Sequence, residues 1–232
     1  IIVGDFDADA MEQKVINLFG QIKMPENAPE RTYFPVPDHK GIDYAMHADP
    51  EASMTLIYLF FQHPSVPREA KNTRAYLRRD IINILSTTML FARFNELAQN
   101  PEAPFSYAVG QDAQFFISAT KDAYTLIAMA KEGKNIEAFQ ALLTEAQRLN
   151  QHGFTAGELE RAKADVKAMI EKNYAERDNR KSQALAESII STFTQGGYMP
   201  GIEIETQEAL NMLPTITVDE VSKFIEDAIS ED

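Results

Sequence analysis

The sequence predicts an α+β fold, a single domain in which helices pack on one face of a largely antiparallel sheet. Three observations support this prediction. Hydrophobic residues make up 44% of the 232 residues, which is enough for a sizeable core. Apolar runs typical of strands lie mainly in the first half of the chain, whereas the second half follows helical spacing. The resulting order, strand–helix–strands–helix–strands–helices, places the helices on one side of the sheet.

The N-terminal segment predicts a short strand, a helix and an extended connection. Ile1–Asp5 joins three β-forming residues to a glycine–aspartate turn signal. Apolar residues then recur at helical spacing, at Met11, Val15, Leu18, Phe19 and Ile22. Residues 23–41 contain Pro25, Pro29, Pro35 and Pro37, which prevent regular structure, so we expect an extended connection there.

Two strands and a long helix are predicted next. The stretches "IDYAMHAD" (42–49) and "SMTLIYLFFQH" (53–63) have the composition of strands. The second is apolar on both faces, which predicts a central, covered strand. Helical spacing then extends from Ala70 to Leu97, and a helix of this length is expected to contain one bend or break.

Three more strands are expected over residues 105–113, 114–122 and 123–132, with Asp122 at the hairpin turn between the last two. The remainder of the chain is helical. One apolar stripe ends at Gly153, a residue typical of helix C-termini. "TAGE" (155–158) and "TVDE" (217–220) are capping boxes that predict the first turns of two further helices.

Composition excludes several functional classes. The formal net charge of −13 argues against a nucleic-acid-binding protein, which needs a basic face, and against docking on an anionic membrane surface. No apolar run approaches the ~20 residues of a membrane-spanning helix, so no membrane insertion is expected. The chain has no cysteine, which excludes disulfides, thiolate metal sites and cysteine nucleophiles.

The motifs of the common hydrolases are missing. The four histidines, His39, His47, His63 and His152, form neither H-E-x-x-H nor the reversed H-x-x-E-H zinc motif. Neither G-x-S-x-G nor a glycine-rich phosphate loop occurs. The residues therefore predict a non-catalytic domain with no catalytic residue, no metal ligand and no cofactor of its own.

Several stretches together resemble the pitrilysin/insulinase-type zinc metallopeptidases, the inverzincins. Their order and spacing agree with the second domain of such enzymes over nearly the whole chain. The matching stretches are "VGDFDADAMEQKVINLFGQI", "MLFARFNELAQNPEAPFSYAV", "GFTAGELERAKADVKAMIEKNYAERDN" and "LPTITVDEVSKFI". The resemblance implies an α/β-roll of the mitochondrial-processing-peptidase-like metallohydrolase fold, comprising residues 1–232.

The resemblance also implies a larger parent enzyme of four homologous domains whose halves enclose a peptide-cleaving chamber. Zinc and the general base lie in its first domain, on the H-x-x-E-H motif that this chain lacks. The chain therefore resembles the non-catalytic domain that follows, and Ile1–Asp5 is expected to be the strand just past the catalytic domain. The implied partners are that homologous domain and a peptide or unfolded polypeptide substrate.

One family feature can be compared residue by residue. The far half of these enzymes supplies an arginine and a tyrosine that hold the substrate carbonyl over zinc. Tyr107 lies in the matching place and is the candidate substrate-binding residue. The arginine is missing, because the two possible alignments give Asn95 or Asn100, and Arg93 is out of register. An ordinary half-buried strand tyrosine is the alternative interpretation, which the missing arginine favours.

Two functional hypotheses follow. The first is an inactive domain of a zinc metalloprotease that completes the peptide-binding chamber and stabilises the catalytic domain. The second is a catalytically dead scaffold subunit of a larger assembly. An independent hydrolase is the least favoured, since the histidine–carboxylate motif is absent. The residues select no compartment, and only the resemblance to exported bacterial enzymes suggests a periplasmic parent.

Overall fold

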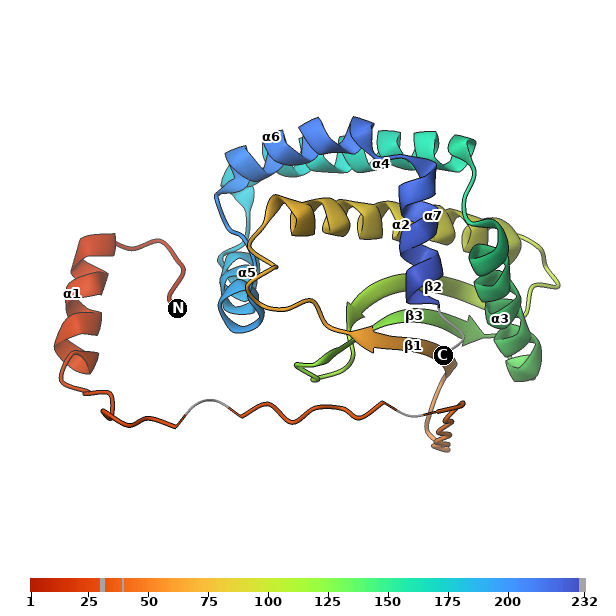
Figure 1. The fold of residues 1–232 in the computed structure, drawn as a ribbon, viewed down its shortest axis with the longest axis horizontal. Helices are drawn as coiled ribbons and strands as arrows, with labels where there is room; N and C mark the ends of the chain where they lie inside the picture. The colour runs from red at the N-terminus through yellow and green to blue at the C-terminus, as the bar shows by residue number, and fades with distance from the viewer. Residues whose placement is uncertain (30–31, 39, 230–232) are drawn as a thin grey trace.

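The structure is a computed structural model that describes residues 1–29, 32–38 and 40–229 (Figure 1). Two single 3₁₀ turns lie at Arg177–Asn179 and Leu213–Thr215. The helices and strands are, in chain order, α1 Ala8–Phe19, β1 Thr55–Pro64, α2 Arg74–Ala98, β2 Phe105–Gln114, β3 Lys121–Ala130, α3 Asn135–His152, α4 Ala156–Ala175, α5 Ser182–Gln195, α6 Ile202–Met212 and α7 Val218–Ala228.

The sheet has three antiparallel strands in the order β1-β3-β2. Tyr58 of β1 lies opposite Ile127 of β3, and Val109 of β2 lies opposite the same residue from the other side. The prediction that β1 is a central, covered strand is therefore wrong, because β3 takes the central place. Both faces of β1 are apolar, but only one of them meets the core.

Helices cover one face of this sheet, as the sequence predicts (Figure 1). The core lies between the two layers, where apolar residues of α2 pack against those of β2 and β3. α2 begins at the N-cap Thr73, whose hydroxyl accepts a hydrogen bond from the backbone of Tyr76. The largest fully buried side chains are Tyr124, Phe94, Phe105, Leu85, Met89, Leu90, Leu126, Leu142, Leu149, Ile216, Ile225 and Val221.

α2 is one uninterrupted helix, so the break expected as one alternative does not occur. No glycine or proline lies within it, and its buried residues continue from Ile81 to Phe94. Continuous packing on the sheet therefore supports a length of 25 residues that an isolated helix would not sustain.

The strand predicted at 114–122 does not form. β2 runs to Gln114 and β3 begins at Lys121, so the residues between them make the hairpin connection. Asp122 is not the turn residue but pairs with Gln114 within the sheet. The reversal needs a positive φ, which Phe116 adopts at 50°. Ser118 stabilises the turn by accepting hydrogen bonds at its Oγ from two backbone N–H groups.

The helix-end signals are confirmed. Thr155 and Thr217 each form a complete capping box, with Glu158 and Glu220 respectively. Gly153 follows α3 with φ of +57°, and a Cβ there would lie 2.3 Å from the Oγ of Ser222. This close approach and the backbone angle both require glycine. α6 lies in the part of the chain that was predicted to be helical, although no signal for its ends was identified.

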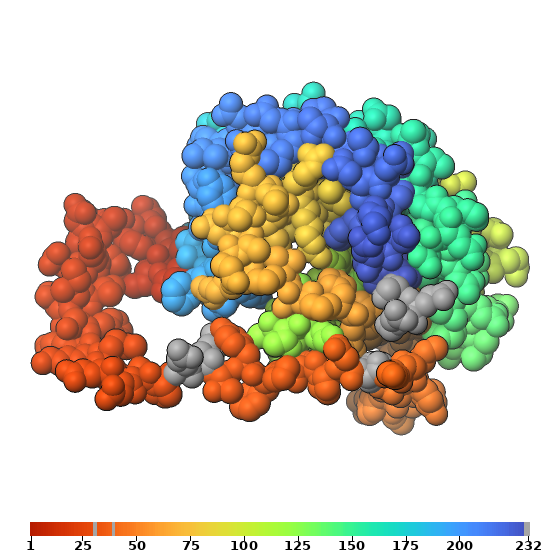
Figure 2. Space-filling model, viewed as in Figure 1, coloured from red at the N-terminus to blue at the C-terminus, as the bar shows by residue number. Residues whose placement is uncertain are grey.

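The N-terminal segment lies apart from this core. The predicted helix forms as α1, capped by the Asp7 carboxylate. Ile1–Asp5 has no partner strand among the described residues and forms no strand here. The strand predicted at 42–49 is wrong for the same reason, since Ile42 and Tyr44 are more than 90% exposed and no strand is paired with them. Figure 2 shows α1 standing away from the body of the molecule, whereas the extended segment after it runs back along the lower side of the view. There the Val36 N–H donates to the Thr120 hydroxyl, and Asp38 pairs with Lys121.

Candidate functional site

A polar cluster joins one end of the sheet to α2. His63 of β1 reaches across β3 and donates from Nε2 to the Asp112 carboxylate of β2, at 2.7 Å. The other oxygen of Asp112 accepts from Arg79 of α2, also at 2.7 Å. The side-chain amide of Asn83 donates to the Asp112 carbonyl, and the Asp112 N–H donates back to Asn83. Both carboxylate oxygens therefore have protein partners, and the cluster acts as a clamp between sheet and helix.

Two ionisable groups of this region have shifted pKa values. The hydrogen bond that His63 donates to Asp112 raises the pKa of His63. Asp80 follows Arg79 on α2. Burial raises the pKa of Asp80 to about 6, although the positive charges of Arg79 and Lys71 oppose this shift. The chemistry that the cluster supports is pH-dependent stabilisation of the sheet–helix contact.

Replacing Asp80 by Asn is expected to stabilise the fold at neutral pH. The folded pKa lies above the ordinary value, so the folded state binds the proton more tightly. The stability that this group contributes is fully present below pH ~3.8 and is lost as pH rises through about 6. Asp80→Asn should raise the free energy of unfolding by up to about 2 kcal/mol at pH 8 and change it little at pH 4. Urea unfolding across this range measures the difference.

The matched control is Asp165→Asn, at an exposed position of α4. It should change the free energy of unfolding by less than about 0.5 kcal/mol at either pH. If the wild type and Asp80→Asn lose stability in parallel between pH 4 and pH 8, burial does not hold the proton on Asp80.

The histidines do not meet. His63 belongs to the clamp, His152 ends α3, and His47 lies in the segment before β1. His39 lies outside the described residues. Within the described ranges no three histidine or carboxylate side chains are placed to hold a metal ion. The donor set therefore does not fit a resident zinc ion.

Arg93, the arginine closest in sequence to the family's substrate-holding position, points into the interior. It binds Glu145 of α3 at 2.8 Å and Glu158 of α4, and it donates to the Gly153 carbonyl. Its guanidinium also lies over the ring of Phe154, 4.8 Å from the centroid. Arg93 thus joins α2, α3 and α4.

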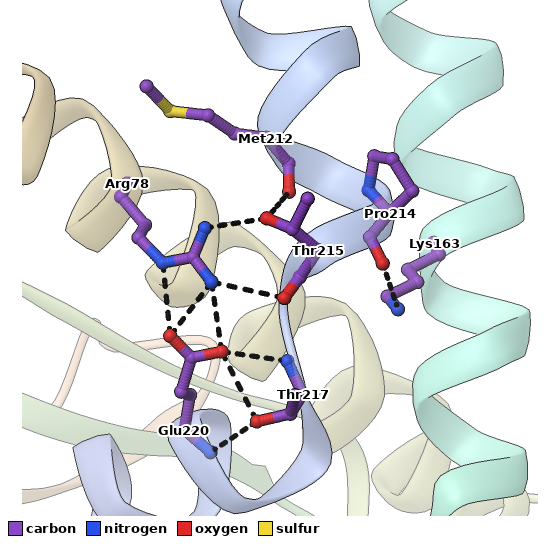
Figure 3. Close-up of polar contacts among 7 residues, drawn as sticks. All are labelled: Arg78, Lys163, Met212, Pro214, Thr215, Thr217 and Glu220. Carbon is purple, nitrogen blue, oxygen red and sulfur yellow. Dashed lines mark hydrogen bonds and ion pairs between the residues drawn. The ribbon is translucent and has the colours of Figure 1, made fainter.

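A second arginine joins α2 to α7 (Figure 3). Arg78 donates to both carboxylate oxygens of Glu220 and to the hydroxyl of Thr215. Beside it lies a shallow hollow of about 420 Å³ between α2 and α6. Arg74, on its rim, is paired with Glu208 at 2.7 Å. Because both arginines of the hollow are neutralised, it carries no excess charge for an anion.

The sheet face opposite the helices is apolar and exposed. We call this surface the open face. An aromatic row follows one side of it: Tyr58 stacks on Phe60 with centroids 5.7 Å apart, and Phe60 contacts Phe115 and Phe116 at the hairpin. The apolar residues of the open face are Leu56, Tyr58, Phe60, Val109, Ile127 and Met129, continued at the hairpin by Phe116 and Ile117; the strand register also places the polar Gln62, Gln111 and Thr125 on this face.

Sequence reasoning missed this surface. The signal was present in "TLIYLFF", which is apolar at both odd and even positions. The even positions were assigned to a second covered face, but Leu56, Tyr58 and Phe60 are 43%, 46% and 38% exposed. An exposed apolar patch that continues over several residues is typical of a protein-binding surface.

Tyr107 lies on β2, an edge strand, and 44% of it is exposed. Its ring centroid is 5.9 Å from that of Phe91 on α2. A bulge between Phe105 and Tyr107 shifts the register of β2 at this point. Tyr107 is thus accessible, and its role in substrate binding stays a prediction.

α1 adds a second apolar surface. None of its residues is buried. The helix and the turn after it expose Val15, Leu18, Phe19 and Ile22, which recur at the spacing of one helix face. No helix of the described chain is long and apolar enough to cross a membrane.

The fold and surfaces together define an α+β domain with exposed apolar surfaces. The family model of the peptidase M16 inactive domain matches residues 1–166. The chain belongs to this family. The description "inactive" agrees with the missing H-x-x-E-H motif.

The chain is also similar to individual proteases in sequence or in fold. The chain is 25% identical over 227 residues to an Arabidopsis thaliana protein, "Zinc protease PQQL-like", covering 97% of this chain and 20% of that protein. The first half of the periplasmic protease PqqL from Escherichia coli superposes with a TM-score of 0.82 at 17% identity, over 97% of this chain and 47% of that one. Whole PqqL gives 0.81 at 18% identity, over 97% of this chain and 24% of that one.

Proposed function

We propose that this chain is the non-catalytic domain of a zinc metalloprotease, where it packs on a homologous catalytic domain and helps to form a chamber for polypeptide substrates. The family match carries the proposal. The chain spans only 20% of its Arabidopsis relative and 24% of PqqL, so proteolysis would belong to a longer parent protein. Zinc would be held by the catalytic domain, because the described residues here offer no ligand set.

In this proposal residues 1–232 are one domain. Ile1–Asp5 follows the catalytic domain, and residues 23–41 connect α1 to the sheet. The edge strand β2 supports a contribution to substrate binding. Its Tyr107 is accessible, and an unpaired strand edge can accept an extended peptide by strand addition. The periplasm is the proposed compartment, since PqqL is a periplasmic protease.

Reconstitution tests the function. The H-x-x-E-H domain of the parent, made as a separate polypeptide, is mixed with this chain and a quenched fluorescent peptide. Cleavage is expected only when both polypeptides are present, and a zinc chelator should abolish it. The matched control replaces the glutamate of H-x-x-E-H in the catalytic polypeptide, which removes the general base.

Other outcomes would contradict parts of the proposal. Cleavage by this chain alone overturns the non-catalytic assignment. If the two polypeptides bind each other but cleavage is the same with and without this chain, the chain is a scaffold subunit. Tyr107→Phe and Tyr107→Ala then separate the proposed substrate contact from the strand packing, since only a contact through the hydroxyl raises KM in both variants.

A further inference from the structure

The ring of His63 is placed so that only its doubly protonated form satisfies both ring nitrogens. Nε2 lies 2.7 Å from Oδ1 of Asp112, and Nδ1 lies 3.1 Å from the carbonyl oxygen of Pro64. A carboxylate and a carbonyl both accept hydrogen bonds, so each ring nitrogen has to donate. A neutral imidazole carries only one N–H and leaves one of these contacts without a proton. Loss of the proton from His63 therefore weakens a contact at the end of β1.

The charged groups around His63 favour the protonated form. The hydrogen bond to Asp112 raises the pKa of His63 above its ordinary value of 6.5, against the opposing effect of burial. Asp122 of β3 lies directly opposite His63, and its charge acts in the same direction as that of Asp112. From α2, Arg79 binds Asp112, and from α7 the ring of Phe224 lies against the Arg79 guanidinium. The other ionisable groups at this end of the sheet are Lys71, Tyr76, Asp80, Lys121 and Asp38, the last two paired with each other.

The end of β1 continues into a loop, residues 65–73, that holds the C-terminal end of α5. Arg68 of this loop donates from its guanidinium to the carbonyl oxygens of Phe193 and Thr194, the second at 2.8 Å. The stem of Arg68 contacts Gly196, where an added Cβ would lie 2.7 Å from its Cγ. Figure 1 shows α5 beside the end of the sheet at which β1 ends. The position of α5 therefore depends on the position of this loop.

α5 has little else to hold it in place. None of its residues is buried, and among the described residues none from α5 belongs to the core or packs against it. Phe193, on its last turn, is 71% exposed. Gln195 donates a hydrogen bond to the side chain of Gln114, the last residue of β2. An element with so little buried apolar surface opens at a low cost in free energy.

We propose that His63 is a pH-dependent latch for α5: the imidazolium fixes the end of β1 and residues 65–73, and its deprotonation lets this loop and α5 move away from the sheet. The stability that the latch contributes is fully present below pH 6.5 and is lost as pH rises through the higher pKa of His63 in the folded state. Because Gln195 leaves Gln114 when α5 moves, release frees the end of the edge strand β2.

Hydrogen exchange followed by mass spectrometry tests the latch in the whole 232-residue chain. Each exchange rate is compared with the intrinsic rate at the same pH, which gives the protection of each peptide. The protection of α5 and of residues 65–73 is expected to fall severalfold from pH 6 to pH 9. This range lies above most of the titration of Asp80, whose pKa is about 6. α4, which buries Leu159, Ala162 and Val166, is the internal reference and should keep its protection.

Two substitutions separate the proton from the loop. His63→Gln has no proton to lose, so α5 should show at both pH values the low protection that the wild type shows at pH 9. The matched control is His152→Gln, at the exposed end of α3, which should keep the pH dependence of the wild type. Arg68→Met should lower the protection of α5 at both pH values and leave the titration of His63 unchanged.

The titration of the His63 ring, followed by NMR in the wild type, keeps the latch testable if His63→Gln does not fold. Its midpoint should lie above pH 6.5 and coincide with the midpoint at which α5 loses protection. Constant protection of α5 between pH 6 and pH 9 overturns the latch, as does a pH-dependent loss that persists in folded His63→Gln. If residues 65–73 lose protection while α5 keeps it, Arg68 does not transmit the change and the proposal fails.

Discussion

Replacing Arg93 by Met is expected to lower the free energy of unfolding by about 3–5 kcal/mol. The side chain of Arg93 is 11% exposed and that of its partner Glu145 is 4% exposed. Without the guanidinium, Glu145 is left as an uncompensated buried charge and Glu158 loses its main counter-charge. Urea unfolding at pH 7, monitored by circular dichroism, measures the loss.

The matched control is Arg148→Met. Arg148 lies 3.8 Å from the same carboxyl group of Glu145, but 59% of its side chain is exposed. Arg148→Met should lower the free energy of unfolding by less than about 1 kcal/mol. Equal effects of the two substitutions would show that Arg93 is not the residue that holds the three helices together.

The Arg93 effect should also depend on pH. Burial alone would raise the pKa of Glu158, but Arg93 and Thr155 outweigh it and lower the pKa to about 2. A lowered folded-state pKa contributes stability above the ordinary value of about 4.5, and this is lost as pH falls through about 2. The wild type and Arg93→Met are therefore expected to converge in stability as pH falls from 4.5 towards 2.

Replacing Phe94 by Ala, as a separate substitution, is expected to lower the free energy of unfolding by about 3–5 kcal/mol. Phe94 is fully buried and meets Phe105 edge to face, with centroids 5.8 Å apart. Its removal opens a cavity between α2 and β2 that these elements cannot fill without losing other contacts. Thermal and urea unfolding should both show the loss.

Phe91→Ala, three residues earlier on the same helix, is the control. Phe91 is 37% exposed and touches Tyr107 at the surface, so its removal should cost less than about 1.5 kcal/mol. A comparable loss in both variants would place the main α2–β2 contact at the surface and not at Phe94.

Structural features that depend on neighbouring residues in the chain could be predicted from the sequence. The capping boxes at Thr155 and Thr217 depend only on residues three apart, and both are formed. Two features require glycine at position 153: its positive φ and the close approach of Ser222. Only the backbone angle is a local property. The α+β fold class followed from the order of elements, which periodicity reveals.

The pairing of strands that lie far apart in the chain could not be predicted from the sequence. The strand order depends on which strand lies beside β3, and the two apolar faces of β1 are compatible with a central or an edge place. Likewise, Asp122 looked like a turn residue until its pairing with His63 and Gln114 was known. The exposed segment 42–49 shows that a strand composition is not sufficient without a neighbouring edge to pair with.

The candidate site was predicted least well. Tyr107 was found by resemblance and is accessible, but its proposed substrate contact needs the partner domain to be tested. The open face was hidden because exposure cannot be read from composition. Arg93 appeared as a near match in sequence, and only its contacts with Glu145 and Glu158 reveal a structural role.

The strand order has a consequence for the kinetics of folding. β2 and β3 are joined by a short hairpin and can pair early, whereas β1 must wait for a strand that follows it by more than fifty residues. During synthesis, the apolar strand Thr55–Pro64 emerges from the ribosome well before Lys121–Ala130, its only partner in the sheet of the described chain. The nascent chain therefore exposes its most aggregation-prone segment throughout that interval, and a chaperone that binds extended apolar peptides would act there.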